Sequence, residues 1–272
     1  MASSRRLRPS ELTPSRIAAA LARRVADIPH AMAWSFSREA RANRDRLATF
    51  RNMHQDARCV VIANGPSLGR MDLSSLRREI TFGLNRIYLN FRSMGFGTSY
   101  YVSINELVLE QFGAEIAGLQ MAKFLNWNRR AIVHKGSPGV HYLRMKLGLN
   151  DDFSRDITLP MSSGGTVTFV ALQLAYLMGF RKVVLIGLDH RFSSAGTPNQ
   201  TELRENVEDR DHFHPNYFPA GSRWQLPDLR RSELAYALAR QAFEADGREI
   251  LDATVDGSCP VFEKTDFSKL FK

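Results

Sequence analysis

The sequence has few of the features that mark disulfide-rich, membrane-spanning or secreted proteins. Only two of its 272 residues are cysteine, Cys59 and Cys259, which excludes a disulfide scaffold and leaves no ligand set for a structural zinc ion. No apolar run approaches the roughly 18 residues that a spanning helix needs. The first residues lack the apolar segment of a secretory signal. We therefore expect a cytoplasmic protein.

Several common catalytic motifs are also missing. The sequence contains no G-x-G-x-x-G loop, no Walker loop and no G-x-S-x-G elbow, which disfavours generic dinucleotide, P-loop and serine-hydrolase functions. Its composition, 44% hydrophobic and 24% charged, excludes disorder over most of the chain. The length suits one large α/β domain or two modest ones.

Lysine is absent from the first 58 residues, where the basic charge is concentrated. This part holds twelve arginines and five acidic residues, a net charge of +7, whereas the remaining chain carries only +2. A protein that follows a nucleic-acid backbone needs a basic surface on its folded body. The nearly neutral body therefore predicts that nucleic acid is not a partner.

We interpret residues 1–57 as a basic helical arm. Its apolar residues recur at helical spacing, Pro29 is expected to end this helix, and two aromatic residues follow: Ile17, Leu21, Val25 and Ile28, then Trp34 and Phe36. The arm either packs on the body or on another subunit of a homo-oligomer, or it contacts anionic lipid as a peripheral element at the inner membrane face.

Residues 58–272 form the predicted body. Apolar, β-branched runs indicate strands buried on both faces, and they alternate with helical segments at 165–178 and 229–245. The expected strands are 59–63, 80–84, 100–104, 131–133, 183–187 and 249–251. This alternation predicts an α/β fold with a doubly wound, mostly parallel, Rossmann-like sheet. Residues 193–228 are predicted to form a lid-like insertion, called the insertion below.

Two turns at the expected strand ends could contact a ligand, the first through a phosphate and the second through a base edge or a sugar hydroxyl. The first strand is followed by Asn64, Gly65, Pro66 and Ser67, at the usual phosphate site of such sheets. The second ends at Asn85, whose amide both donates and accepts. Each pattern is equally compatible with an ordinary Gly-Pro turn or a loop-capping asparagine.

Ser162, Ser163 and Gly164 precede the helical segment at 165–178 and could form an anion site or a simple N-cap. Asp189 follows a later strand, where its carboxylate could bind a sugar hydroxyl, a metal or a basic partner. In the insertion, His212 and His214 could supply a general base. These histidines with Asp209 and Asp211 have no specific metal spacing, so we predict no metal site.

Together, Asn-Gly-Pro-Ser-Leu after the first strand, Asn85 after the second, Ser-Ser-Gly before a helix and Gly187-Leu188-Asp189 after a later strand form an ordered pattern. It resembles the 6-hydroxymethylpterin diphosphokinase MptE-like family, which is related to bacterial family-42 sialyltransferases and motility-associated factor glycosyltransferases. The resemblance covers roughly residues 58–255. Ala63 stands where the sialyltransferases have glycine, and the acceptor-side loops differ, which leaves the donor open.

The resemblance implies roles for these residues. Asn64, Gly65, Pro66 and Ser67 would hold the phosphate and ribose of a nucleotide, Asn85 the nucleotide or the transferred group, and Ser162, Ser163 and Gly164 would line the pocket. His214 would be the general base, with His212 as the second candidate. Tyr217 would contact a phosphate.

These roles imply a transferase, most simply a glycosyltransferase that moves a sugar from a CMP-sugar to a surface glycan without a required cofactor. The alternative is a pterin diphosphokinase that uses ATP and Mg²⁺ held by Asp189 and by Asp209 or Asp211. A third possibility is a nucleotide-binding module without catalytic activity.

Overall fold

The computed structural model describes residues 14–133, 137–148, 150–193, 196–205 and 209–271. The first 13 residues of the predicted arm, and residues 194–195 and 206–208 of the predicted insertion, lie outside the described residues.

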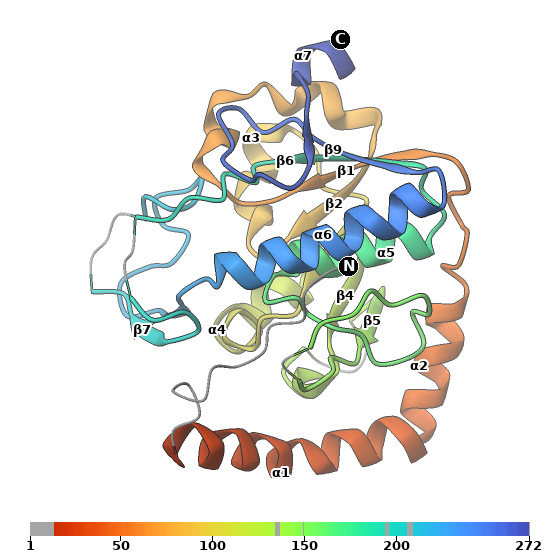
Figure 1. Cartoon of the computed structure of the whole chain (residues 1–272), viewed down its shortest axis with the longest axis vertical. Coiled ribbons are helices and arrows are strands. Elements are labelled where there is room, and N and C mark those ends of the chain that lie inside the picture. Colours follow the sequence, from red (N-terminus) through yellow and green to blue (C-terminus); the bar gives the residue numbers. More distant parts are fainter. Residues whose placement is uncertain (1–13, 134–136, 149, 194–195, 206–208, 272) are drawn as a thin grey trace.

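A parallel sheet of eight strands forms the centre of the molecule (Figure 1). The strands are β1 (Arg58–Ile62), β2 (Ile80–Leu84), β3 (Tyr100–Ser103), β4 (Ala122–Asn126), β5 (Val140–Leu143), β6 (Lys182–Ile186), β9 (Glu249–Asp252) and β10 (Glu263–Lys264). Every pairing in the order β10-β9-β6-β1-β2-β3-β4-β5 is parallel. The predicted Rossmann-like α/β fold is confirmed.

Helices and a small hairpin surround this sheet. α5 and α6 lie over one face (Figure 1), and residues 168–177 of α5 are all buried, as expected for a central covering helix. The α-helices are α1 (Pro14–Phe36), α2 (Arg38–Ala48), α3 (Phe91–Met94), α4 (Glu106–Ala117), α5 (Val167–Leu177), α6 (Leu229–Ala245) and α7 (Phe267–Leu270). Four 3-10 helices are η2 (Pro66–Arg70), η3 (Leu73–Arg78), η4 (Ile87–Asn90) and η5 (Trp127–Arg129). The insertion contains an antiparallel hairpin of β7 (Thr201–Leu203) and β8 (Arg223–Gln225).

The strand order reverses between β1 and β6. From β1 the chain proceeds outward through β2 to β5, then returns to pair β6 with the other side of β1. Ligands of open α/β sheets bind beyond the carboxyl ends of strands at such a switch point. The topology therefore places the turns after β1 and β6 at the position where a ligand is expected.

The prediction of a strand at residues 131–133 is wrong. These residues form a turn after η5, where Val133 is buried against the core. The strands at this end of the sheet are instead β4 and β5, whose polar residues interrupt the apolar pattern. Lys123 is fully buried in β4, and its ammonium donates to the carbonyls of Leu119 (2.5 Å) and Pro138 (2.8 Å). Because backbone oxygens satisfy the ammonium, a lysine is tolerated inside this strand.

The arm is helical, but the predicted end at Pro29 is wrong, since α1 continues to Phe36. Proline removes only the hydrogen bond to the Val25 carbonyl, on a side of α1 where both residues are exposed to water. Contacts of the following turns with the body hold the helix together beyond this point. Trp34, for example, is buried with its ring 5.2 Å from that of Trp127. No described helix is both long enough and apolar enough to cross a membrane.

His141 in β5 makes the stability of the fold sensitive to pH. Burial, with the nearby charges of Arg46 and Lys123, lowers its pKa from 6.5 to about 4. Between these values the unfolded chain binds a proton on this ring and the folded chain does not. The free energy of unfolding should therefore decrease as pH falls from 6.5 towards 4.

We expect His141 to account for about 1–2 kcal/mol of this decrease, because partial exposure screens the full linkage value of roughly 3 kcal/mol. Urea unfolding at pH 7.5 and pH 5 should show a smaller loss for His141→Gln than for the natural chain. An equal loss in both proteins would exclude His141 as the source.

Candidate active site

A cavity of about 160 Å³ lies at the switch point, beyond the carboxyl ends of β1, β2 and β6. Its walls come from six segments of the chain, most of which are distant in sequence. They are the turns after β1 (63–65) and β2 (84–85), the start of α5 (165–168), the segment after β6 (187–192), the insertion (211, 212, 227) and the start of α6 (229, 232, 236). Of the predicted site residues, the cavity wall contains Asn64, Gly65, Asn85, Asp189 and His212, together with Asp211 of the alternative metal set.

The turn after β1 is closed by a carboxylate of the protein itself. Asp189 accepts hydrogen bonds from the backbone amide of Ser67 (3.1 Å) and from its hydroxyl (2.6 Å). Pro66 opens η2 at this point, and Ser67 is buried. A phosphate bound to Ser67 would have to displace Asp189, whereas Asn64 and Gly65 line the cavity directly.

Two asparagines present amide groups at the rim. The side-chain oxygen of Asn64 is buried and has no hydrogen-bond partner among the described residues, which is unfavourable unless a ligand or water supplies a donor. Asn85 adopts a positive φ of 45°, and its side-chain oxygen accepts from the Ser103 hydroxyl at 3.1 Å. The rim therefore offers an unmet acceptor beside a positioned amide.

The predicted Ser-Ser-Gly anion turn is also bonded within the protein. The Ser162 hydroxyl donates to Asp152 (2.6 Å), and the Gly164 amide donates to Asp151 (3.1 Å). Asp151 in turn forms a bidentate ion pair with Arg231 at 2.7 and 2.9 Å. Two carboxylates of the protein thus bond this turn, and Ser162, Ser163 and Gly164 are not part of the cavity lining.

Gly165 and the first turn of α5 replace that turn in the cavity wall. Thr166 caps α5 by accepting the Thr168 amide at 3.3 Å, and its hydroxyl lies 3.3 Å from that of Tyr236. The amino end of this 11-residue buried helix therefore faces the cavity, where its dipole favours an anion.

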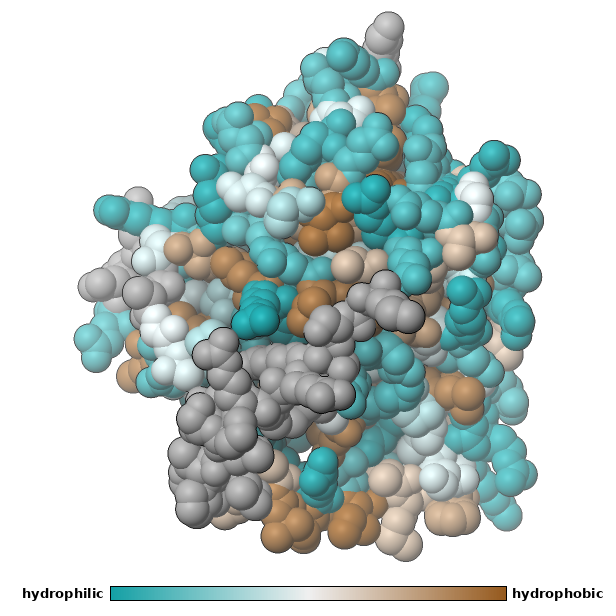
Figure 2. All heavy atoms as spheres, in the orientation of Figure 1, coloured by the Kyte–Doolittle hydropathy of each residue, from teal (hydrophilic) through white to brown (hydrophobic). Residues whose placement is uncertain are grey.

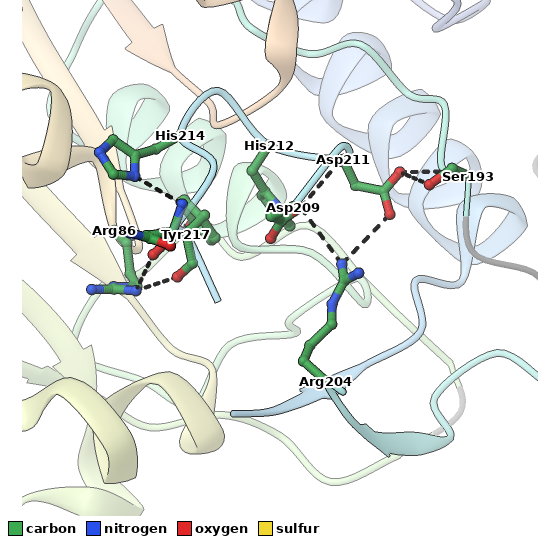
Figure 3. Close-up of polar contacts among 9 residues, drawn as sticks. Arg86, Ser193, Arg204, Asp209, Asp211, His212, His214 and Tyr217 are labelled. Carbon is green, nitrogen blue, oxygen red and sulfur yellow. Dashed lines mark hydrogen bonds and ion pairs between the residues drawn. The ribbon is translucent and has the colours of Figure 1, made fainter. Parts of the chain in front are cut away.

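His212 and Asp209 form a dyad at the cavity wall (Figure 3). The Nδ1 atom of His212 lies 2.9 and 3.0 Å from the two carboxylate oxygens of Asp209, and the ring stacks on Tyr217 with centroids 3.9 Å apart. This contact fixes the imidazole and leaves Nε2 for proton transfer.

The charge of Asp209 is stabilised by its neighbours. Burial alone would raise the pKa of Asp209, but the hydrogen bond and charge of His212, together with Arg204, outweigh this effect and lower the pKa. The Nη2 atom of Arg204 lies 3.5 Å from Asp209 and 3.6 Å from Asp211. An ionised Asp209 can stabilise a His212 ring that has accepted a proton.

The other two predicted residues of the insertion do not line the cavity. The Nδ1 atom of His214 accepts from the backbone amide of Asn216 at 3.1 Å. The hydroxyl of Tyr217 is buried and accepts from the backbone amide of Arg86 at 3.2 Å. The ring of Tyr217 instead stacks on the ring of His212.

Three residues at the candidate site were not recognised in the sequence. Arg86 is buried and its guanidinium donates to the carbonyls of Asn216 (3.2 Å) and Tyr217, which holds the insertion on the end of β2 (Figure 3). His190 and Arg191 line the cavity directly after Asp189. The sequence indicated these two residues only by their position next to Asp189. It does not show which residues line a cavity in the folded chain.

The described residues do not present a free carboxylate set for Mg²⁺. Asp189 is bonded to Ser67 and Asp209 to His212, and Asp211 accepts from the amide and hydroxyl of Ser193 at 2.6 and 2.8 Å. In the part of the chain that the structure describes, no three His, Cys, Asp or Glu side chains are grouped to hold a metal ion. We therefore derive no step through a metal.

Gly65 is required by the close approach of Asp189. A Cβ atom on residue 65 would lie 1.9 Å from Asp189 Oδ2 and 2.7 Å from the Gly187 carbonyl, whereas a Cβ on Gly69 of the same turn would meet nothing within 4 Å. We expect Gly65→Ala to lower the free energy of unfolding by about 3 kcal/mol or more, through overpacking and loss of the Asp189 hydrogen bonds. Gly69→Ala is the matched control, and equal unfolding midpoints in urea would contradict this explanation.

Comparison with known proteins agrees with this architecture. Residues 36–195 match the family described as 6-hydroxymethylpterin diphosphokinase MptE-like, and no curated protein matches the sequence. A MAf glycosyltransferase from Magnetospirillum magneticum AMB-1 has a similar fold, with a TM-score of 0.51 and 12% identity. The similarity covers 85% of this chain but only 38% of that enzyme, and at this identity it concerns the fold alone. The chain belongs to the 6-hydroxymethylpterin diphosphokinase MptE-like family.

Proposed function

We propose that this protein is a transferase that binds a nucleotide-activated donor in the cavity at the switch point, and that it is a glycosyltransferase with His212 as general base. The Asp209–His212 dyad at the cavity wall is the observation that carries this proposal. The family membership and the fold shared with a glycosyltransferase support the class of reaction.

We assign a proposed binding role to each side of the cavity. The amino end of α5 suits the phosphate of the donor, because the helix dipole favours negative charge there. Arg191 also lines the cavity and adds positive charge, although its guanidinium donates to the carbonyl of Asp256 at 2.8 Å. The unpartnered oxygen of Asn64 suits a hydroxyl or amino group of the nucleotide. A CMP-linked acidic sugar is the donor that we propose to test first, with a surface glycan as acceptor.

In the transfer step, Nε2 of His212 takes the proton of an acceptor hydroxyl as its oxygen attacks the anomeric carbon. A new carbon–oxygen bond forms while the bond to the donor phosphate breaks, and the nucleotide leaves with the electron pair. Asp209 stabilises the protonated ring. The alternative diphosphokinase reaction requires carboxylates for Mg²⁺, and the candidates for that role are bonded to Ser67, His212, Ser193 and Arg204.

Nucleotide binding is the first prediction of this proposal. A ligand present at about 100 times its dissociation constant stabilises the folded state by about 2.7 kcal/mol, which raises the melting temperature by roughly 5–10 °C for a chain of this size. We expect CMP to do so in the presence of EDTA. A shift by ATP that requires Mg²⁺ would favour the diphosphokinase, and no shift with CMP, UDP, AMP or ATP would contradict nucleotide binding.

The two histidines of the insertion provide a matched pair for the catalytic role. We expect His212→Gln to lower kcat for release of CMP from a CMP-linked acidic sugar by about 10²–10⁴-fold, because the base is lost, with an unchanged CMP-induced melting shift. His214→Gln should remain within a few-fold of the natural enzyme. The reverse ranking would assign the base to His214, and intact activity in both variants would remove the histidine mechanism.

A further inference from the structure

α1 is attached to the body through its polar side. Asp27 forms an ion pair with Arg144 and accepts from the side chain of Asn128 at 3.0 Å. The carbonyl of His30 accepts from the indole nitrogen of Trp127 at 3.0 Å, and one turn later Trp34 packs on the same indole. The helix is thus held in a fixed orientation by contacts with residues that follow β4 and β5.

The opposite side of α1 carries large apolar side chains that face outward. They follow one another at intervals of four, three, four and four residues, which places them along one side of the helix. These residues, called the apolar stripe below, are Leu21, Val25, Ile28, Met32 and Phe36, and they are between 53% and 82% exposed. Figure 2 shows apolar side chains along the lower edge of the molecule, where α1 runs.

This orientation is the reverse of an ordinary surface helix, which turns its apolar side to the core. Of the two aromatic residues in the predicted arm, Trp34 is buried against the body. Phe36 is therefore the exposed aromatic residue of the apolar stripe. A contiguous row of exposed apolar side chains on a rigid helix indicates a surface that becomes covered. The chemistry around the stripe indicates what covers it.

The surroundings of the apolar stripe are strongly basic. Arg23 and Arg24 are exposed on α1, and Arg38, Arg41 and Arg46 are exposed on α2. Residues 1–58 carry a net charge of +7. Two copies of the chain that met along this stripe would bring two such positive charges together, which is unfavourable. A negatively charged lipid surface would instead attract the arginines and could cover the apolar stripe.

We propose that the apolar stripe of α1 inserts into the headgroup region of an anionic lipid surface, with the arginines of α1 and α2 on lipid phosphates. A helix that combines an apolar side with arginines is suited to lie in the plane of such an interface. This inference is independent of the proposed transfer reaction, since no residue of the cavity takes part in it.

The test measures co-sedimentation of the full chain with vesicles. We expect binding to phosphatidylcholine vesicles that contain about one-third phosphatidylglycerol, and at least tenfold weaker binding to phosphatidylcholine alone. Val25→Glu and Ile28→Glu should each lower the partition coefficient about tenfold, because a carboxylate enters the headgroup region. Leu159→Glu is the matched control, since Leu159 is equally exposed, at 55%, but lies on the body.

Circular dichroism and melting of each variant verify that the fold is retained, as expected for exposed positions. Light scattering after size exclusion measures the oligomeric state in the same preparations. Failure of the natural chain to sediment with anionic vesicles, or an equal effect of Leu159→Glu, would overturn the proposal. A dimer that Val25→Glu converts to a monomer, without vesicle binding, would assign the stripe to a second copy and also overturn it.

Discussion

The carboxylate of Asp189 is the contact on which the candidate site depends. It leaves the end of β6 and bonds the amide and hydroxyl of Ser67 after β1, and thereby joins the two strands on either side of the switch point. Its approach requires glycine at residue 65. Since this internal anion occupies the first turn, we place the donor phosphate of the proposed reaction at the amino end of α5, which lines the cavity. The turn at the usual phosphate position of the fold is therefore closed by a contact within the protein.

A second internal contact positions the chemistry. The insertion supplies the dyad, but it is held on the sheet by Arg86, which donates to two of its carbonyls, and by the Phe213 amide, which bonds the Asn64 carbonyl at 2.9 Å. These contacts hold the residues that directly follow His212, whose ring is oriented by Asp209 and stacks on Tyr217. The proposed base lies on an irregular segment that oriented hydrogen bonds hold in place, as general-base catalysis requires.

The sequence was informative where a local pattern determines the structure, and less so where distant residues do. The apolar runs at β1, β2, β3 and β6 predicted their strands, because these strands are buried on both faces. β4 was missed because Lys123 interrupts its pattern, and its partners are carbonyls that only the fold brings near. The same reason applies to the site. Ser67 and Gly164 form turns of the predicted kind, but the carboxylates that bond them come from residues 189 and 151. His212 and His214 are two residues apart, and only the position of Asp209 distinguishes them.

The placement of α1 connects the two proposals in space. The residues that hold α1 follow β4 and β5 at their carboxyl ends, and the cavity lies at the carboxyl ends of β1, β2 and β6. Both features therefore belong to the same edge of one parallel sheet. An α1 helix that lies in a lipid interface brings this edge towards the membrane and leaves the opposite edge in water. An acceptor glycan anchored in that membrane would then reach the site by movement in two dimensions, so that binding to lipid raises the local concentration of acceptor without any additional contact in the cavity.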